Sequence, residues 1–304
     1  MASLKEVRIR IVSVNSTKQI TAAMKMVSAA KLRRAQDAIV RMRPYAEKLS
    51  AIMGNVSESL QGNEGKFSEQ REVKKVLLVA IVSNRGLAGA FNAMVFRAVR
   101  RQVAECEAQV QQVTVLPIGK KALDQYRRTK QFNAELPADL AKLYDGLSFD
   151  KVAPVAELIM DRFADGTYDR VMLVYNKFKN AAMQVLMEEP YLPVSAPPKS
   201  VSATSPTSTK KSDAKGMVPD YIMEPSREEI VKELVPKSLK IQLYKALLDS
   251  NASEHGARMT AMHKATDNAD AMLKELKLTY NKARQASITN EILEIVGGAE
   301  ALKG

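Results

Sequence analysis

A heptad pattern in the first sixty residues constrains the fold more than any other feature of this sequence. From residue 32 onward, apolar or small side chains recur at alternating steps of three and four, at Leu32, Ala35, Ile39, Met42, Ala46, Leu49, Met53, Val56 and Leu60. This spacing is typical of a helix that keeps one stripe against a partner helix along its length.

The same helix is predicted to begin near residue 4. A second heptad run comprises Leu4, Val7, Ile11 and Val14, and a predicted slip in phase joins it to the first run through Ile20, Ala23, Val27 and Ala30. Residues 4–60 would then form a rod of about 85 Å at ~1.5 Å per residue. Pro44 removes one backbone donor, so we expect a kink there rather than a break. Gly62, Asn63 and Gly65 are predicted to end the helix.

The last third of the chain carries a matching pattern. Steps of three and four again separate Met259, Met262, Thr266, Ala269, Leu273, Leu276, Tyr280 and Ala283. Two such helices at opposite ends of one chain can pair as an antiparallel coiled coil within the chain, or between chains. The pairing within one chain is favoured by its higher effective concentration.

The segment between the helices predicts an α/β domain with a mixed, Rossmann-like sheet. Strands are expected at 73–82, 113–119, 170–178 and 181–194, with helices near 91–108 and 152–163. The segment 196–219 is rich in Pro, Ser, Thr and Lys and is predicted to be a flexible loop. We therefore expect a coiled-coil helix at 1–62, the α/β domain at 73–195, the loop at 196–219 and a coiled-coil helix at 225–304.

The cysteine, histidine and charge content limits the kinds of site that this chain can carry. The single cysteine, Cys106, excludes an internal disulfide, and the two histidines lie eight residues apart, so no metal site or cofactor is expected. The sequence contains no membrane-spanning stretch and no secretory signal, which predicts a soluble or peripheral protein.

The net charge is +12 and is unevenly distributed. Residues 1–50 hold eleven Lys or Arg against three Asp or Glu, which indicates either a solvated face or an acidic partner.

The α/β segment contains no complete phosphate loop. "GLAG" at 86–89 follows a predicted strand, but it lacks the third glycine of the dinucleotide fingerprint. "PIGKKA" at 117–122 has Thr114 and Lys121 where a P-loop needs Gly and Ser or Thr. The small residues are better explained as sites of close helix–strand packing, and a mechanical or structural role is favoured over an enzyme.

Three segments carry a resemblance to a known family. "IVSVNSTKQITAAMKMVSAAKLRRAQ" at 11–36 and the segment 253–302 resemble the terminal helices of the gamma subunit of F-type ATP synthases. "SNRGLAGAFN" at 83–92 resembles that family's central signature, although Ala88 stands where many members have Cys. The resemblance covers about the first 60 and the last 80 residues strongly, and the middle in scattered motifs.

The resemblance implies a rotor shaft. In the family the two terminal helices form a coiled coil inside a ring of three alpha and three beta subunits, and the α/β domain sits with epsilon-type and delta-type stalk subunits on the membrane ring of c subunits. ATP is made or hydrolysed on the beta subunits, so this chain is expected to be non-catalytic and to reach the membrane only through the c-ring.

The same resemblance implies roles for particular residues. Arg284 and Gln285 match the catch that binds a beta-subunit loop, and Met24, Lys25 and Arg258 match the neck that faces acidic beta-subunit loops. An apolar bearing inside the ring is expected to receive Ile292, Ile295, Val296 and Leu302. The plainer alternatives are that Met24 is a seam residue, that Arg284 and Gln285 are solvated, and that Arg258 pairs with Glu254 at i,i+4.

Two other functions and the location stay open. A basic coiled-coil nucleic-acid-binding protein would need aromatic residues among the cations of 1–44, and that segment has none. An α/β enzyme would have to bind nucleotide. A pI near 9.6 and the Ser/Thr/Pro-rich loop favour the matrix side of the mitochondrial inner membrane. The start of the chain at the coiled coil, without an Arg-rich presequence, also suits the cytoplasmic face of a bacterial plasma membrane.

Overall fold

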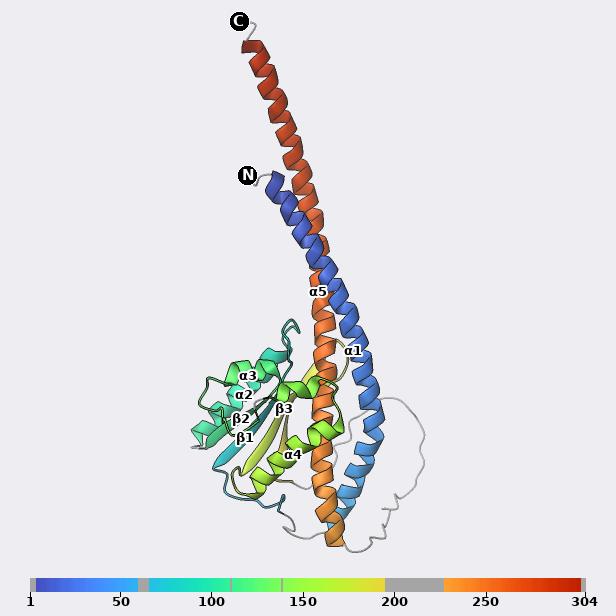
Figure 1. Cartoon of the computed structure of the whole chain (residues 1–304), viewed down its shortest axis with the longest axis vertical. Helices are drawn as coiled ribbons and strands as arrows, with labels where there is room; N and C mark the ends of the chain where they lie inside the picture. The colour runs from blue at the N-terminus through green and yellow to red at the C-terminus, as the bar shows by residue number, and fades with distance from the viewer. Residues whose placement is uncertain (1–3, 60–65, 110, 138, 195–226, 302–304) are drawn as a thin grey trace, which may run out of the picture.

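Two long antiparallel helices dominate the structure, with an α/β domain beside the lower half of the pair (Figure 1). The computed structural model describes residues 4–59, 66–109, 111–137, 139–194 and 227–301. Helix α1 spans Leu4–Ser59 without a break at Pro44, and α5 spans Arg227–Ala301. The predicted loop at 196–219 and the glycines predicted to end the first helix lie outside the described residues.

The seam of α1 is continuous, so the predicted slip in phase is wrong. Ile20 and Val27 are 60% and 57% exposed, and the stripe that faces α5 instead runs through polar residues, namely Lys18, Thr21, Lys25 and Ser28. These positions extend the steps of three and four from Val14 to Leu32. Polar side chains are tolerated at three of these positions because they have partners, on α5 for Lys18 and Thr21 and on α1 itself for Ser28. Thr21 Oγ1 lies 2.9 Å from Thr266 Oγ1, and Lys18 Nζ lies 2.5 Å from Asp270 Oδ1.

The seam of α5 agrees with the prediction, and the pairing is within one chain. All eight predicted seam positions between Met259 and Ala283 are buried or half-buried. Because Thr21 faces Thr266, the antiparallel register places Leu4 near Ala283. Residues 284–301 therefore have no described residue of α1 opposite them, which at ~1.5 Å per residue is a length of about 27 Å. Figure 1 shows the C-terminal end of α5 extending beyond the N-terminal end of α1.

The described part of the α/β domain contains one mixed sheet, as predicted. Its strands are β1 (Lys75–Ile81), β2 (Gln112–Ile118), β3 (Arg170–Phe178) and β4 (Gln184–Leu192), in the order β2-β1-β3-β4. The first three strands are parallel, and β4 returns antiparallel to β3. β1 is buried from Val76 to Ile81, as expected for a parallel strand covered on both faces.

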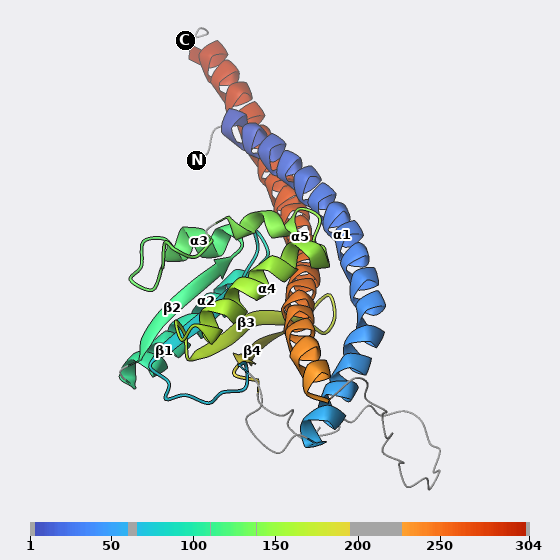
Figure 2. The ribbon, with the colours of Figure 1, turned by 60° about the horizontal axis from the view of Figure 1, so that its bottom comes forward.

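Helices cover both faces of the sheet (Figure 2). On one face, α2 (Phe91–Ala108) and α3 (Lys120–Tyr126) pack against Val76, Leu78 and Ala80. On the other, α4 (Phe149–Ala164) and the lower part of α5 pack against Leu77 and Val79. The predicted helix at 91–108 is confirmed at both ends, whereas the short 3₁₀ helix η1 (Leu140–Tyr144) was not predicted. The shared core with α4 makes α5 part of both the shaft and the domain.

Candidate functional site

The projecting end of α5 exposes a stripe of large apolar side chains. Ile292, Ile295 and Val296 are 54%, 71% and 56% exposed, and Ile288 joins them at helical spacing. Arg284 and Gln285 are exposed and lie just beyond the level of Leu4, where α1 begins. A Cβ added at Gly297 or Gly298 would meet no other part of the described chain within 4 Å. Leu302 lies outside the described residues. An apolar stripe of this kind on a bare helix marks a surface that a partner covers.

Met24 and Lys25 lie on the opposite helix, below the projecting end. Both are half-buried, Lys25 in the seam and Met24 beside it, and the carbonyl of Met24 accepts a hydrogen bond from Ser28 Oγ at 2.8 Å. The register set by Thr21 and Thr266 places them opposite residues near 263. The structure thus places them roughly one and a half helical turns from Arg258 along the shaft, and it does not bring the three side chains into one cluster.

Arg258 faces inward, which differs from the expected neck contact and matches the plainer alternative. Its side chain is 9% exposed and forms an ion pair with Glu254, at 2.6 Å from Nη1 to Oε1. Its Nη2 donates to the carbonyl oxygens of Arg85 at 3.1 Å and Gly86 at 3.4 Å. Arg258 therefore joins α5 to the loop after β1, and its guanidinium is occupied within the chain.

Burial shifts the pKa values of two ionisable groups beside Arg258, those of Glu254 and His255. Burial raises the pKa of the Glu254 carboxyl, and the neighbouring Arg258 guanidinium opposes that rise. Burial also lowers the pKa of His255 to about 4, helped by the charges of Arg258 and Lys31. His255 is consequently neutral near pH 7, and the buried charge of Arg258 is balanced chiefly by Glu254.

The loop at 83–89, which corresponds to "SNRGLAG", is held in a strained conformation. Leu87 has a φ of 62° and Gly89 a φ of 59°, and a left-handed conformation costs an ordinary residue roughly 1–2 kcal/mol. Asn84 Nδ2 donates to the Ala141 carbonyl at 2.8 Å, and Ser83 Oγ donates to the Arg85 carbonyl at 2.7 Å. The side chain of Leu87 is nevertheless exposed. These hydrogen bonds hold the loop within the α/β domain.

Gly119 explains the "PIGKKA" motif as close packing. Its φ is 102°, and a Cβ there would lie 2.3 Å from the carbonyl oxygen of Val82. The backbone N–H of Lys121 donates to the Ser83 carbonyl at 3.2 Å. The glycine thus lets the start of α3 approach the end of β1, as the packing interpretation predicted.

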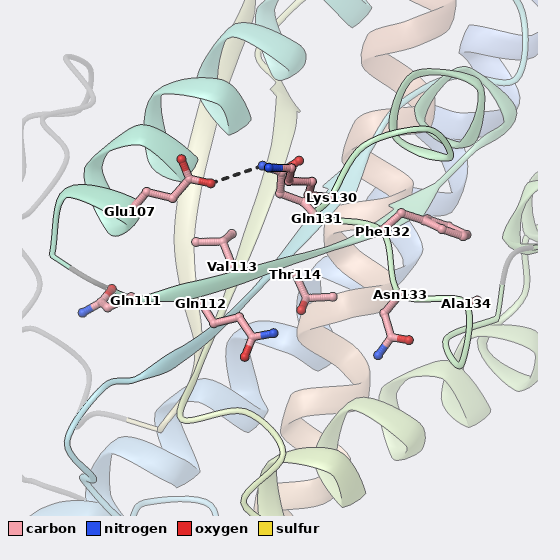
Figure 3. Close-up of a pocket in the computed structure, with 10 residues that line it drawn as sticks. All are labelled: Glu107, Gln111, Gln112, Val113, Thr114, Lys130, Gln131, Phe132, Asn133 and Ala134. Carbon is pink, nitrogen blue, oxygen red and sulfur yellow. Dashed lines mark hydrogen bonds between the residues drawn. The ribbon is translucent and has the colours of Figure 1, made fainter.

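A polar hollow of about 360 Å³ lies at the outer edge of β2 (Figure 3). Gln131 Nε2 donates to Glu107 Oε1 at 3.2 Å across its rim, and the Gln131 carbonyl accepts from the N–H of Val115 at 2.8 Å. Its lining consists of Glu107, Gln111, Gln112, Val113, Thr114, Lys130, Gln131, Phe132, Asn133 and Ala134. These ten residues include neither histidine nor cysteine, and their acid is already paired with an amide. We assign no catalytic chemistry to the hollow.

The described helices and side chains also bear on membranes and metals. Within the described ranges, none of the helices combines the length and the apolar character needed to cross a bilayer. The same ranges contain no group of three or more His, Cys, Asp or Glu side chains placed to hold a metal ion.

A paired helical shaft with a bare apolar end, fixed to an α/β domain that has close packing in place of a phosphate loop, defines a structural stalk protein. A family model described as ATP synthase matches residues 3–302, and relatives named ATP synthase gamma chain align along the whole chain. The chain belongs to the ATP synthase gamma chain family.

The relatives are bacterial and similar over their full length. The gamma chain of Flavobacterium psychrophilum is 57% identical over 305 residues, and that of Flavobacterium johnsoniae is 55% identical over 305 residues, each with complete coverage of both chains. The gamma chain of Cytophaga hutchinsonii is 53% identical, with 99% of both chains covered. These relatives do not support the expected mitochondrial location.

Solved structures share the fold. A chain from the Euglena gracilis mitochondrial ATP synthase has a TM-score of 0.60 at 20% identity and covers 98% of this chain and 94% of its own length. A chain from the central stalk and c-ring structure of the Tetrahymena thermophila enzyme has a TM-score of 0.55 at 24% identity, with 81% and 99% covered. Their similarity confirms the predicted combination of paired terminal helices and a mixed central sheet.

Proposed function

We propose that this chain is the central-stalk rotor of an F-type ATP synthase and couples proton-driven rotation of a c-ring to ATP synthesis or hydrolysis on beta subunits. The observation that carries the proposal is the bare end of α5, residues 284–301, which projects past α1 with an apolar stripe exposed. An isolated helix of this length is marginal in water and gains stability when a partner surrounds it.

The apolar stripe acts as the bearing. Ile292, Ile295 and Val296, with Leu302 as a further member, turn within an apolar sleeve of alpha and beta subunits. Apolar contacts are non-directional, so no single angle is strongly preferred. Hydrogen bonds in the same place would favour particular angles and resist rotation.

Arg284 and Gln285 form the catch. Both are exposed just beyond the level where α1 begins, so their donors can reach a beta-subunit loop without competing contacts from α1. A guanidinium and an amide offer several directed hydrogen bonds at one place on the shaft. Such bonds give a preferred resting angle in an otherwise smooth bearing.

Met24 and Lys25 form the neck. They lie on the basic N-terminal half of α1, where residues 1–50 carry eleven cations and three acids. Acidic beta-subunit loops complement this charge. Arg258, which the resemblance also implies at the neck, contributes by holding the loop at 83–89 and not by direct contact.

The remaining assignments follow the same family pattern. The partners are three alpha and three beta subunits, epsilon-type and delta-type stalk subunits and the c-ring, with catalysis on the beta subunits. The functional segments are 1–62, 73–195, the loop at 196–219 and 225–304. The bacterial relatives favour the cytoplasmic face of a bacterial plasma membrane, with attachment through the c-ring.

Copurification tests the proposal. A tagged chain expressed in its native host is expected to bring down alpha and beta subunits in an assembly that hydrolyses ATP. The purified chain alone is expected neither to bind nor to hydrolyse ATP, because neither glycine motif forms a phosphate site. Micromolar ATP binding by the free chain in calorimetric titration, or a chain that purifies without both subunits, would contradict the rotor assignment.

A further inference from the structure

The middle of α5 is held by the α/β domain at two separate places. Along residues 254–261, the helix contacts the loop at 83–89 on one side and Ala181, in the turn between β3 and β4, on another. These two segments are far apart in the sequence, and each follows the carboxyl end of its strand, β1 or β3, which run parallel.

The first contact is polar and buried. Arg258, fixed by Glu254, donates to the carbonyls of Arg85 and Gly86. A small apolar cluster of Ala88, Phe91 and Ala257 closes the space beside these bonds. A planar guanidinium that serves a carboxylate and two carbonyls is restricted in direction as well as in distance.

The second contact depends on close backbone approach. A Cβ at Gly256 would lie 3.1 Å from the Ala181 carbonyl oxygen, and Thr260 Oγ1 donates to that same oxygen at 3.1 Å. At about 100° per residue, the Gly256–Thr260 face is roughly 160° from the Glu254–Arg258 face. The two contacts therefore grip α5 from different sides.

Helix α1 occupies a third face of α5. Leu32 and Ala35 pack against Ala252, and Met259 lies beside them. The domain thus holds α5 directly through hydrogen bonds and close backbone contact, whereas the contact of α1 with α5 here is one of apolar packing.

We infer that residues 254–261 of α5 form a joint that locks the α/β domain to α5 against rotation about the helix axis. Torque enters or leaves the domain through α5, and Arg258 is the positioning residue that holds the loop at 83–89 in this joint. The inference of a lock rests on the geometry; its role in torque rests on the proposed rotor function.

Three variants test the joint in the assembled ATP synthase. Arg258→Lys keeps the charge opposite Glu254 but loses the forked guanidinium that reaches two carbonyls. Arg258→Met removes both the charge and those hydrogen bonds. Thr260→Val removes the hydrogen bond from the hydroxyl to the Ala181 carbonyl. The matched control is Lys237→Met, which breaks the exposed i,i+4 pair with Glu233 on the same helix.

Hydrogen exchange and angular spread are the readouts. In Arg258→Lys, the amides of Ser83 and Lys121 at the base of the loop are expected to exchange about tenfold to a hundredfold faster, the loss expected when hydrogen bonds from a charged group disappear. A probe on the α/β domain, with the beta subunits immobilised, is expected to show a wider angular distribution at rest. The control is expected to match the wild type in both.

The possible outcomes distinguish failure of the proposed joint from failure of the proposed rotor function. Wild-type exchange and angular spread in Arg258→Lys and Thr260→Val would overturn the joint, even if Arg258→Met fails to assemble. If the chain does not copurify with alpha and beta subunits, the rotor function fails instead. Faster exchange at Ser83 in the free chain would then still support the lock.

Discussion

The hydroxyl groups of Thr21 and Thr266 meet across the seam at 2.9 Å, although 245 residues separate them in sequence. Each hydroxyl also lies within hydrogen-bond distance of a carbonyl on its own helix, at Lys18 and Met262. A polar pair among apolar seam positions favours one axial register over others, because a shifted register separates the two hydroxyls. The pair fixes how far α5 projects beyond α1.

Replacing both threonines tests this role. Thr21→Val and Thr266→Val are each expected to destabilise the chain by about 1 kcal/mol, whereas the double variant is expected to recover most of that loss because two valines pack together. Chemical denaturation of the four proteins gives the coupling energy. Thr279→Val, at an exposed site whose hydroxyl bonds within its own helix, is the control. Additive single effects would contradict the pairing.

The catch is tested by the double variant Arg284→Ala, Gln285→Ala. Assembly is expected to stay intact, because both side chains are exposed and the bearing stripe is unchanged. ATP hydrolysis is expected to slow about tenfold, which corresponds to ~1.4 kcal/mol of lost transition-state stabilisation. Steady-state hydrolysis by the purified complex measures the effect, with Lys282→Ala as an exposed control on the same helix. Wild-type turnover in the double variant would exclude the catch.

The neck is tested by Met24→Lys. The new cation lies beside Lys25, so it is expected to strengthen attraction to acidic beta-subunit loops by about 1–2 kcal/mol in a partly buried setting. Over-stabilising one angle is expected to lower proton pumping per ATP while hydrolysis persists. Pumping by membrane vesicles measures the coupling, and Met24→Leu is the control without charge. Equal pumping per ATP in Met24→Lys and wild type would remove Met24 from the neck.

Gly119 is the clearest structural requirement in the α/β domain. Gly119→Ala is expected to destabilise the chain by on the order of 3 kcal/mol or more, because its φ is unfavourable for alanine and the new Cβ meets a carbonyl. Gly298→Ala, with nothing within 4 Å, is expected to be neutral or slightly stabilising. Thermal unfolding compares the two, and similar melting temperatures would contradict the packing argument.

Asp249 gives the chain a pH-dependent stability. Burial raises the pKa of this carboxyl to about 6 from an ordinary 3.8, against the opposing effects of Lys245, Lys177 and Arg43. Between these two values the folded state retains a proton that the unfolded state has lost, so stability falls as pH rises from about 4 to 6 and then levels off. Asp249→Asn is expected to remove this dependence.

The gain from Asp249→Asn is correspondingly pH-dependent. The variant is expected to match the wild type below about pH 4 and to be more stable by up to ~3 kcal/mol above pH 6. Denaturation curves across this range measure the difference. The exposed acid Asp267 supplies the control, as Asp267→Asn. A wild-type slope in Asp249→Asn would show that another group causes it.

Periodicity in the sequence predicted the long helices and the mixed sheet, because hydropathy repeats are local and strong. The slip in phase was a wrong prediction because Thr21 and Ser28 look misplaced in a seam until their partners are known. Thr21 pairs with Thr266 of α5, and Ser28 donates to the Met24 carbonyl of its own helix. The i,i+4 spacing of Glu254 and Arg258 was visible in sequence. The contact of Arg258 with the carbonyls of Arg85 and Gly86 could not be predicted, because those carbonyls belong to a loop about 170 residues away in the sequence.

Because α5 is one uninterrupted helix, its length also sets the angle between the apolar stripe and the α/β domain. Its lower part is fixed in the α/β core and its end carries the apolar stripe, with one continuous helix between them. Deleting one residue between these parts would turn the stripe by about 100° relative to the domain and shorten its reach by ~1.5 Å. Inserting seven residues would turn it by only about 20°. The number of residues between core and tip therefore sets the phase of the rotor, and changes in length should be tolerated best when they are close to whole helical turns, as with seven or eleven residues.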